Sequence, residues 1–315
     1  MMLFQLIPFL LAAQLDVTDN NAWEFGPEYH FSGFAKMITS LEQDMGKALG
    51  TGVYFNLTCR PREPDVLRCR LLNTTITRLK PQGFSVDNAE PDSNDTHRVF
   101  NIIKVPFEVK FNERGIDTFI TEGKDAPVWS INQVGLITSQ LNIGIDDYYE
   151  LGSTHKAREN FTVGECEVNF TITRQQIAEH KQGNNDFKLI PLGKLEKLAG
   201  GSILVNKERH VKDCIRCVEP FFGSRYTLGL LLRDVITKLK TSISRISISK
   251  HDFTSDTINE SDVYDENRKK SGKVMDHMKL TLESITPAKE KIQQFSKPLV
   301  YGGLVDLVRL KSANL

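Results

Sequence analysis

Apolar and polar residues alternate along much of the chain, in short segments separated by turn-forming residues. Residues 67–71, 246–249 and 278–283 alternate at every second position, which is the period of a strand with one buried face. β-Branched and aromatic residues, which favour strands, are concentrated in three further segments: 99–110, 167–173 and 203–206. Connections of hairpin length join such segments, so the pattern predicts a mainly β protein with a large antiparallel sheet that curls or closes.

One segment carries a helical pattern instead. It begins after Pro127, a residue that is favoured at helix starts. Apolar residues then recur at a spacing of three or four, at Ile131, Val134, Ile137 and Leu141. The pattern therefore predicts a helix over residues 128–142.

Two polar segments lack periodic apolar residues and are predicted to be loops. Residues 84–97 are acidic and rich in turn formers. Residues 251–272, approximately, carry many charges and few core residues, which predicts a long polar loop or a disordered insert. Neither segment marks a domain boundary, because strand patterns resume after each. We therefore expect one domain over residues 16–300, followed by a short tail over residues 301–315.

Residues 226–240 fit two different structures. Their leucines fall on one face of a helix with basic residues elsewhere, which is typical of an amphipathic helix at a lipid surface. The alternative, which we favour, is a pair of strands with a solvated basic edge. Residues 224–250 hold six bases and one acid, so this segment is the candidate for lipid or partner binding. The residues that would carry it are Arg225, Leu228, Leu231, Leu232, Arg233, Lys238 and Lys240.

The first residues resemble a secretory leader. Residues 1–13 are almost wholly apolar and too few to span a bilayer, and the small Ala12 and Ala13 precede a polar run. The segment lacks the basic residues that usually open a leader, so a buried N-terminal strand is the alternative. The composition predicts a signal peptide over residues 1–15 and a secreted, extracellular protein.

Six N-x-S/T sequons favour the same compartment, because N-glycosylation occurs in the secretory pathway. The glycosylation candidates are Asn56, Asn73, Asn94, Asn160, Asn169 and Asn259. Some of them fall in predicted strands, so we do not expect all six to carry a glycan.

The five cysteines are also compatible with a secreted protein. Cys59 and Cys69 flank a turn-rich insert between two strand-like segments, so they are predicted to bridge a hairpin. Cys214 and Cys217 form a C-x-x-C motif, which we interpret as a short-loop disulfide rather than a redox pair or a zinc site. Cys166 is left over, so either it is free or this pairing is wrong.

Composition and motifs exclude several classes of function. Forty basic residues balance 40 acidic ones, which argues against a nucleic-acid binder because such a protein needs a basic surplus. No run of 18 apolar residues occurs, so no transmembrane span is predicted. No G-x-S-x-G, H-E-x-x-H or P-loop motif occurs, so we predict no enzyme, no metal site and no cofactor other than a bound lipid.

Six segments resemble, in order, motifs of the N-terminal domain of vitellogenins and their relatives, the large lipid transfer proteins. Residues 23–31 (WEFGPEYHF) resemble the W-x-x-G-x-x-Y-x-[FY] opening of that domain. Residues 106–110 resemble its PFE-hydrophobic-K strand, and residues 127–141 resemble its P-x-W-x-x-N segment before a helix. Residues 164–168 resemble its G-x-C strand, residues 207–217 its cysteine-containing stretch, and residues 278–285 its late strand. Two departures lie in or near the helix, where Val134 replaces a usual Lys and Asn142 a usual Gln.

The resemblance implies a large N-terminal barrel around one helix and a role in lipid transport, with lipid or lipoprotein surfaces as partners. The alternative is a receptor- or partner-binding barrel with no lipid cargo, since the family's barrel is implied in receptor recognition and subunit contact. Family members that carry lipid are much longer, so we expect a short relative that lacks the lipid-cavity domains. Burial of an acyl chain of about 16 methylenes is worth roughly 13 kcal/mol, but only where a matching cavity exists.

Overall fold

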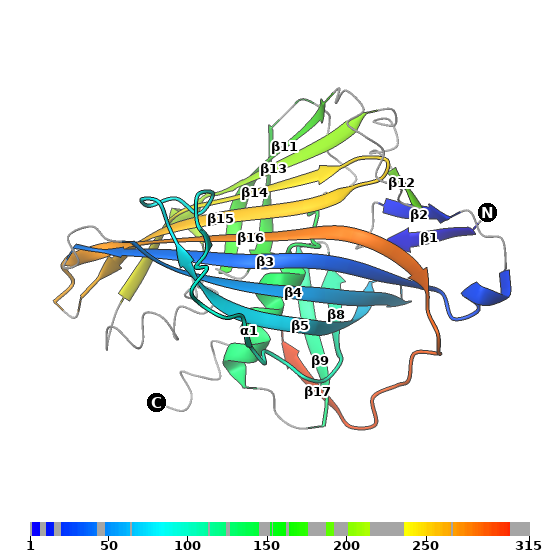
Figure 1. Ribbon diagram of the computed structural model, residues 1–315. Coiled ribbons are helices and arrows are strands. Elements are labelled where there is room, and N and C mark those ends of the chain that lie inside the picture. The colour runs from blue at the N-terminus through cyan, green and yellow to red at the C-terminus, as the bar shows by residue number, and fades with distance from the viewer. Residues whose placement is uncertain are drawn as a thin grey trace.

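The computed structural model describes most of the chain, namely residues 2–6, 11–15, 20–42, 48–63, 65–112, 114–123, 127–144, 152, 154–161, 164–175, 187–191, 201–214, 236–265 and 267–302. Strands dominate these residues (Figure 1). The helices among them are α1 (Val128–Ser139) and the short 3-10 helices η1 (Asn20–Trp23) and η4 (Val211–Asp213).

Eleven strands of the described chain form a closed barrel. In spatial order they are β10 (Thr154–Phe161), β11 (Gly164–Gln175), β13 (Ser202–Arg209), β14 (Ile236–Ile248), β15 (Phe253–Tyr264), β16 (Lys270–Pro287), β3 (Pro27–Leu41), β4 (Ala48–Glu63), β5 (Val66–Lys80), β8 (Phe107–Asn112) and β9 (Gly115–Glu122). Neighbours are antiparallel except β9 and β10, which meet in parallel at Gly115 and Asn160 and close the ring. Figure 1 shows the long strands from β14 to β5 side by side as one curved wall. The predicted mainly β, antiparallel barrel is confirmed.

Smaller strands lie at the margins of the barrel. The two-residue strands β6 (Glu90–Pro91) and β7 (Arg98–Val99) pair with β5, and β17 (Pro298–Gly302) pairs with β9. A separate sheet contains β1 (Met2–Leu6), β2 (Leu11–Leu15) and β12 (Phe187–Pro191), and it lies at the N-terminal side of Figure 1. Tyr301 and Gly302, the first two residues of the predicted tail, belong to β17, and the rest of that tail lies outside the described residues.

Residues 253–264 form β15, which corrects the polar loop predicted at about 251–272. The strand alternates in burial as far as Ser261, and most of its buried side chains are polar. The buried residues are Phe253, Ser255, Thr257, Asn259, Ser261, Asp262 and Val263. The loop prediction was wrong because it required apolar residues on the inner face. Here that face carries hydroxyl and amide groups instead, in a barrel whose interior is partly polar.

The segment predicted as strand over residues 99–110 is strand only near its two ends. Its middle leaves the sheet at Phe100, and Ile102 is buried in the main hydrophobic cluster. Ser130 Oγ of α1 donates a hydrogen bond to the carbonyl oxygen of Ile102. This middle segment therefore contacts the helix instead of pairing with a neighbouring strand, which explains why its β-branched residues do not form a longer strand.

Helix α1 ends three residues before the predicted boundary and is buried on several sides. Its apolar residues Ile131, Val134 and Ile137 join the same hydrophobic cluster as the barrel strands. Polar residues of the same turns, Thr138 and Ser139, are buried too, and their hydroxyls donate to carbonyl oxygens one turn back in the helix. A helix buried around its circumference in this way is a core helix, so the prediction of a barrel that encloses one helix is confirmed.

Candidate functional site

Several large aromatic side chains are buried in the described barrel. Phe31 of β3 and Phe253 of β15 meet edge to face with ring centroids 6.4 Å apart. The largest fully buried side chains include Tyr29, Phe107, Phe111, Phe119, Phe170 and Phe253. The space that these residues and α1 occupy is not available to an acyl chain.

A buried ionic network joins the end of α1 to the barrel wall. Lys207 Nζ donates to Glu159 Oε1 at 2.5 Å and to the Asn142 carbonyl oxygen at 2.8 Å. Arg209 Nη2 donates to Glu159 Oε2 at 3.1 Å, so one carboxylate serves two cations. Burial lowers the pKa of Lys207 to about 8 and also lowers the pKa of Arg209, while Glu159 opposes both shifts.

Hydroxyl groups extend this network across β14 and β15. Arg209 Nη1 donates to Ser244 Oγ at 2.8 Å, and Gln140 Oε1, just after α1, accepts from Ser255 Oγ at 3.1 Å and Thr257 Oγ1 at 2.9 Å. The helix end is thereby tied to three strands. These hydrogen bonds position the end of α1 inside the barrel.

The network was missed in the sequence, although a signal for it was present. In β13 every second residue faces inward, and Lys207 and Arg209 share the parity of the buried Ile203 and Val205. Two basic residues on the buried face of a strand require an internal anion, because isolated buried charges are strongly unfavourable. The sequence could have predicted an internal carboxylate, but not that Glu159 supplies it.

The disulfides confirm one predicted pair and correct the other. Cys59 and Cys69 are bonded across the β4–β5 ladder, as the hairpin pattern predicts. Cys214 is bonded to Cys166 instead of Cys217, which lies outside the described residues. The reason is that β11 and β13 are adjacent and the chain after β13 turns back over β11, which places Cys214 beside Cys166.

The predicted lipid- or partner-binding segment is described only in part. Lys238 and Lys240 lie in β14; Lys238 is exposed, and Lys240 Nζ lies 3.8 Å from Asp262. The remaining predicted residues lie outside the described chain: Arg225, Leu228, Leu231, Leu232 and Arg233. The strand alternative is therefore shown for residues 236–240.

The sequons differ in exposure. Asn56, Asn73 and Asn94 are exposed, and Asn160 and Asn169 are half-buried. Asn259 is 2% exposed, and its Nδ2 donates to Asp276 inside the barrel at 2.7 Å. A glycan on that nitrogen would have no room, so the structure speaks against Asn259 as a site. The other five stay predictions.

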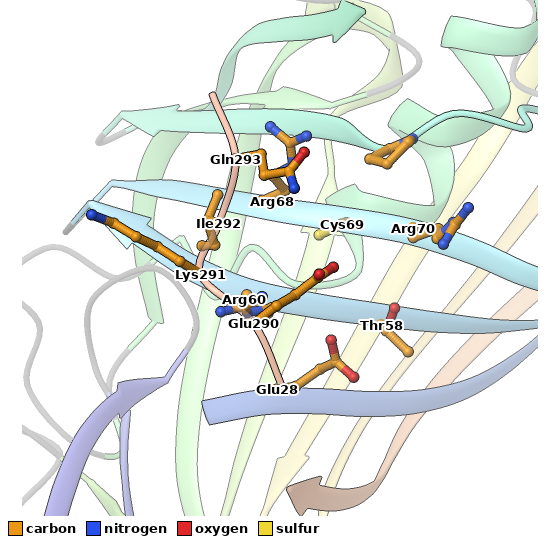
Figure 2. Close-up of a pocket in the computed structure, with 11 residues that line it drawn as sticks. Glu28, Thr58, Arg60, Arg68, Cys69, Arg70, Glu290, Lys291, Ile292 and Gln293 are labelled. Atoms are coloured by element: carbon orange, nitrogen blue, oxygen red, sulfur yellow. The ribbon is translucent and has the colours of Figure 1, made fainter. Parts of the chain in front are cut away.

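A surface pocket of about 210 Å³ lies on the outside of β3, β4 and β5 (Figure 2). It is covered on one side by the strap, which we define as residues 288–297 between β16 and β17. Ala288 N donates to the Gly26 carbonyl oxygen, and Ser296 N donates to Glu122, so both ends of the strap are held. Figure 2 shows Glu290, Lys291, Ile292 and Gln293 of the strap passing over the two strands that carry the arginines.

Arginines from two paired strands form the floor of this pocket. Arg60 of β4 and Arg68 of β5 are cross-strand partners. Arg60 Nη2 donates to the Phe25 carbonyl oxygen at 2.9 Å, and Arg68 Nη1 donates to Glu108 at 3.0 Å. The Arg68 guanidinium also lies 3.9 Å from the centre of the Phe295 ring, a cation–π contact that holds the strap.

Opposite charges share the pocket. Arg60, Arg68, Arg70 and Lys291 line it together with Glu28 and Glu290. Burial lowers the pKa of Arg60, Glu28 and Glu290 oppose this, and the like charge of Arg68 adds to it. The sequence also contained a signal for this pocket. Because the bonded Cys59 and Cys69 face inward, the residues next to them, including Arg60 and Arg68, must face outward on the same side of the sheet.

Within the described residues, no helix has the length and apolar character needed to cross a bilayer. The fold and the pocket thus define a class of protein: a β-barrel packed with its own side chains and a helix, which presents charged groups on its outer face.

The chain belongs to the vitellogenin N-terminal domain family, whose model matches residues 23–290. It is 24% identical over 317 aligned residues to Vitellogenin-1 of Solenopsis invicta, with 93% of this chain and 18% of that protein covered. Its fold is similar to a solved structure of lipovitellin that concerns lipid–protein interactions, with a TM-score of 0.56 and 15% identity. That match covers 90% of this chain and 28% of the lipovitellin chain, so the chain spans less than a third of either relative.

Proposed function

We propose that the protein acts in lipid transport as a secreted member of this family and that its barrel binds a lipid or lipoprotein surface from outside. The observation that carries this proposal is the set of large aromatic side chains buried in the barrel beside α1. Aromatic side chains and α1 occupy the described space in which an enclosed lipid would lie. Family membership supports lipid transport, and the buried aromatic side chains support binding at the outer face.

Two measurements on protein secreted by eukaryotic cells test this proposal. Native mass spectrometry reports whether lipid co-purifies with the chain, and flotation with phospholipid vesicles reports whether the outer face binds a lipid surface. We expect vesicle binding with little or no enclosed lipid. Protein that neither extracts lipid nor floats with vesicles would overturn the proposal.

Secretion through a leader over residues 1–15 is part of the proposal. Strands β1 and β2 lie in the separate small sheet, so their removal would leave every pairing of the eleven-strand barrel in place. The exposed Asn56, Asn73 and Asn94 are then the favoured glycosylation sites. N-terminal sequencing of the secreted chain and a mobility shift after glycosidase treatment test both points.

The second candidate is a receptor- or partner-binding barrel without lipid cargo. It is favoured by the basic segment, of which Lys238 and Lys240 lie in β14. Electrostatic recognition over such a segment should weaken with salt, because exposed charges are screened over about 10 Å at 0.1 M ionic strength. A variant with Arg233, Lys238 and Lys240 reversed to Glu should lose partner binding, and unchanged binding to each partner tried would reject this candidate.

A further inference from the structure

The pocket under the strap has unused donors and acceptors of both charges. Arg60 Nη2 donates to the Phe25 carbonyl oxygen and its Nε is buried, so this guanidinium would meet a ligand through its Nη atoms. Arg70 is exposed, and neither it nor Glu290 forms an ion pair with any described residue. Among the described residues, the carboxylate of Glu28 has a single ion-pair contact, at 3.5 Å from His30, so it can still bind a ligand. The pocket therefore offers guanidinium groups and carboxylates to the same ligand.

Apolar side chains border these charges. Phe25, whose carbonyl oxygen Arg60 contacts, and Val105, next to the lining Pro106, are each 38% exposed. Ile292 of the strap lines the pocket itself. Exposed apolar residues beside arginines suit a lipid surface, because guanidinium groups reach the polar layer while apolar side chains contact the acyl region.

We propose that this pocket binds the headgroup of a zwitterionic phospholipid, with its phosphate on Arg60 and Arg70 and its ammonium group beside Glu28 and Glu290. The proposal rests on the proposed function and names the lipid class for it. A simple anion is disfavoured because the two carboxylates would repel it, and a simple cation is disfavoured by the arginines. A ligand that carries both charges a few bonds apart satisfies both sets of groups.

The size of the pocket agrees with a headgroup rather than a whole lipid. Its volume of about 210 Å³ is below the roughly 300–1,000 Å³ of sites that enclose drug-sized ligands. The acyl chains would thus stay in the lipid surface, and the strap would lie against the headgroup. The anchored ends of the strap keep Glu290 in place beside Arg60 without a large rearrangement.

Flotation with phosphatidylcholine vesicles tests this assignment. The wild type is compared with Arg60→Gln/Arg70→Gln and with Glu28→Gln/Glu290→Gln, each checked for folding by its thermal transition. Arg78→Gln is the matched control, because Arg78 is an exposed arginine of β5 that lies outside both the pocket and the basic segment. We expect each double variant to bind at least tenfold more weakly and the control to bind like the wild type. Soluble phosphocholine should compete, whereas inorganic phosphate or choline alone should compete much less.

The outcomes separate this inference from the proposed function. If the wild type binds no vesicle and carries no lipid, the proposed function fails. If the wild type binds vesicles but the double variants bind equally, or phosphocholine does not compete, the proposed function stands and the headgroup assignment is wrong. Equal competition by inorganic phosphate would make the pocket a plain anion site, and displacement by an acidic peptide alone would make it a peptide site; either result overturns the assignment.

Discussion

Two buried polar clusters lie in the same barrel and differ in how their charges are matched. At one, Glu159 faces Lys207 and Arg209. At the other, Asp276 of β16 receives a hydrogen bond from Asn259 and has no cation within 4.0 Å among the described residues, while its Oδ2 has no hydrogen-bond partner. Burial raises the pKa of Asp276 to about 8. The barrel thus tolerates a buried acid in two ways, either by pairing it with cations or by keeping it protonated.

The largest expected effect comes from removal of the shared anion. Glu159→Gln would leave Lys207 and Arg209 buried without a counter-charge, and loss of one partner of a buried ion pair typically costs about 3–5 kcal/mol. The unfolding free energy from chemical denaturation at pH 7 should fall by that amount. The control is Glu165→Gln, because Glu165 lies 3.7 Å from the exposed Arg114 and Arg158, and such pairs contribute less than about 1 kcal/mol. Similar losses for both variants would show that the Glu159 network is not energetically special.

Removal of the buried acid is expected to have the opposite effect at Asp276, where it should stabilise the fold. The test is the pH dependence of the unfolding free energy. The folded-state pKa is raised, so the contribution to stability is full below pH 4 and is lost as pH rises toward 8. Between pH 5 and pH 7 the wild type should lose about 2–3 kcal/mol relative to Asp276→Asn, which cannot ionise. Asp252→Asn is the control, since Asp252 is exposed and its carboxylate accepts a hydrogen bond from Ser249 at the surface. A difference between wild type and Asp276→Asn that stays flat with pH would mean that Asp276 is ionised in the fold.

These clusters also show what the sequence could predict. Alternation predicted the β-rich barrel, and the spacing after Pro127 predicted α1, because both patterns place apolar residues inside. The same rule failed for β15, where Ser255, Thr257 and Asn259 occupy the inner face. Their partners are Gln140, just after α1, and Asp276 of β16, so the reason for a polar inner face is not local to the strand.

The candidate pocket could not be predicted from the sequence for a related reason. The arginines beside Cys59 and Cys69 are visible as a local pattern, and the predicted hairpin disulfide would place them on one face. The acidic half of the pocket comes from Glu28 and Glu290, which lie at opposite ends of the barrel sequence and meet only when β3 pairs with β16. A pocket built from such distant segments forms only when the barrel closes. The periodicity of apolar residues in the sequence does not predict which distant segments closure brings together.

A smaller effect on stability should distinguish Lys207 from Arg209, the two cations of the Glu159 network. Burial lowers the pKa of Lys207 to about 8, so its contribution to stability is full above about pH 10.5 and is lost as pH falls toward 8. Between pH 8 and pH 10, the stability of the wild type should therefore rise by about 2 kcal/mol relative to Lys207→Met. Lys156→Met is the control, because Lys156 is exposed and pairs with Glu167 at the surface. Parallel pH curves for wild type and Lys207→Met would contradict a buried, titrating Lys207.

The smallest effect gives the most closely matched comparison, because it uses one substitution at two positions of β15. Ser255 Oγ donates to Gln140 at 3.1 Å, whereas the Oγ of the fully buried Ser261 has no hydrogen-bond partner. Ser255→Ala should cost about 1 kcal/mol, the usual net value of a hydrogen bond, with Thr257 keeping Gln140 partly satisfied. Ser261→Ala removes an unsatisfied polar group and should be neutral or stabilising by about 0.5 kcal/mol.

Denaturation of both variants under the same conditions decides the point. The two side chains have the same volume and lie on the same inner face of the same strand, so strand propensity and cavity terms nearly cancel in the difference. If Ser261→Ala proved as costly as Ser255→Ala, Ser261 would have a partner in solution. The difference between the two serines would then vanish, and the contrast between the two clusters would rest on Asp276 alone.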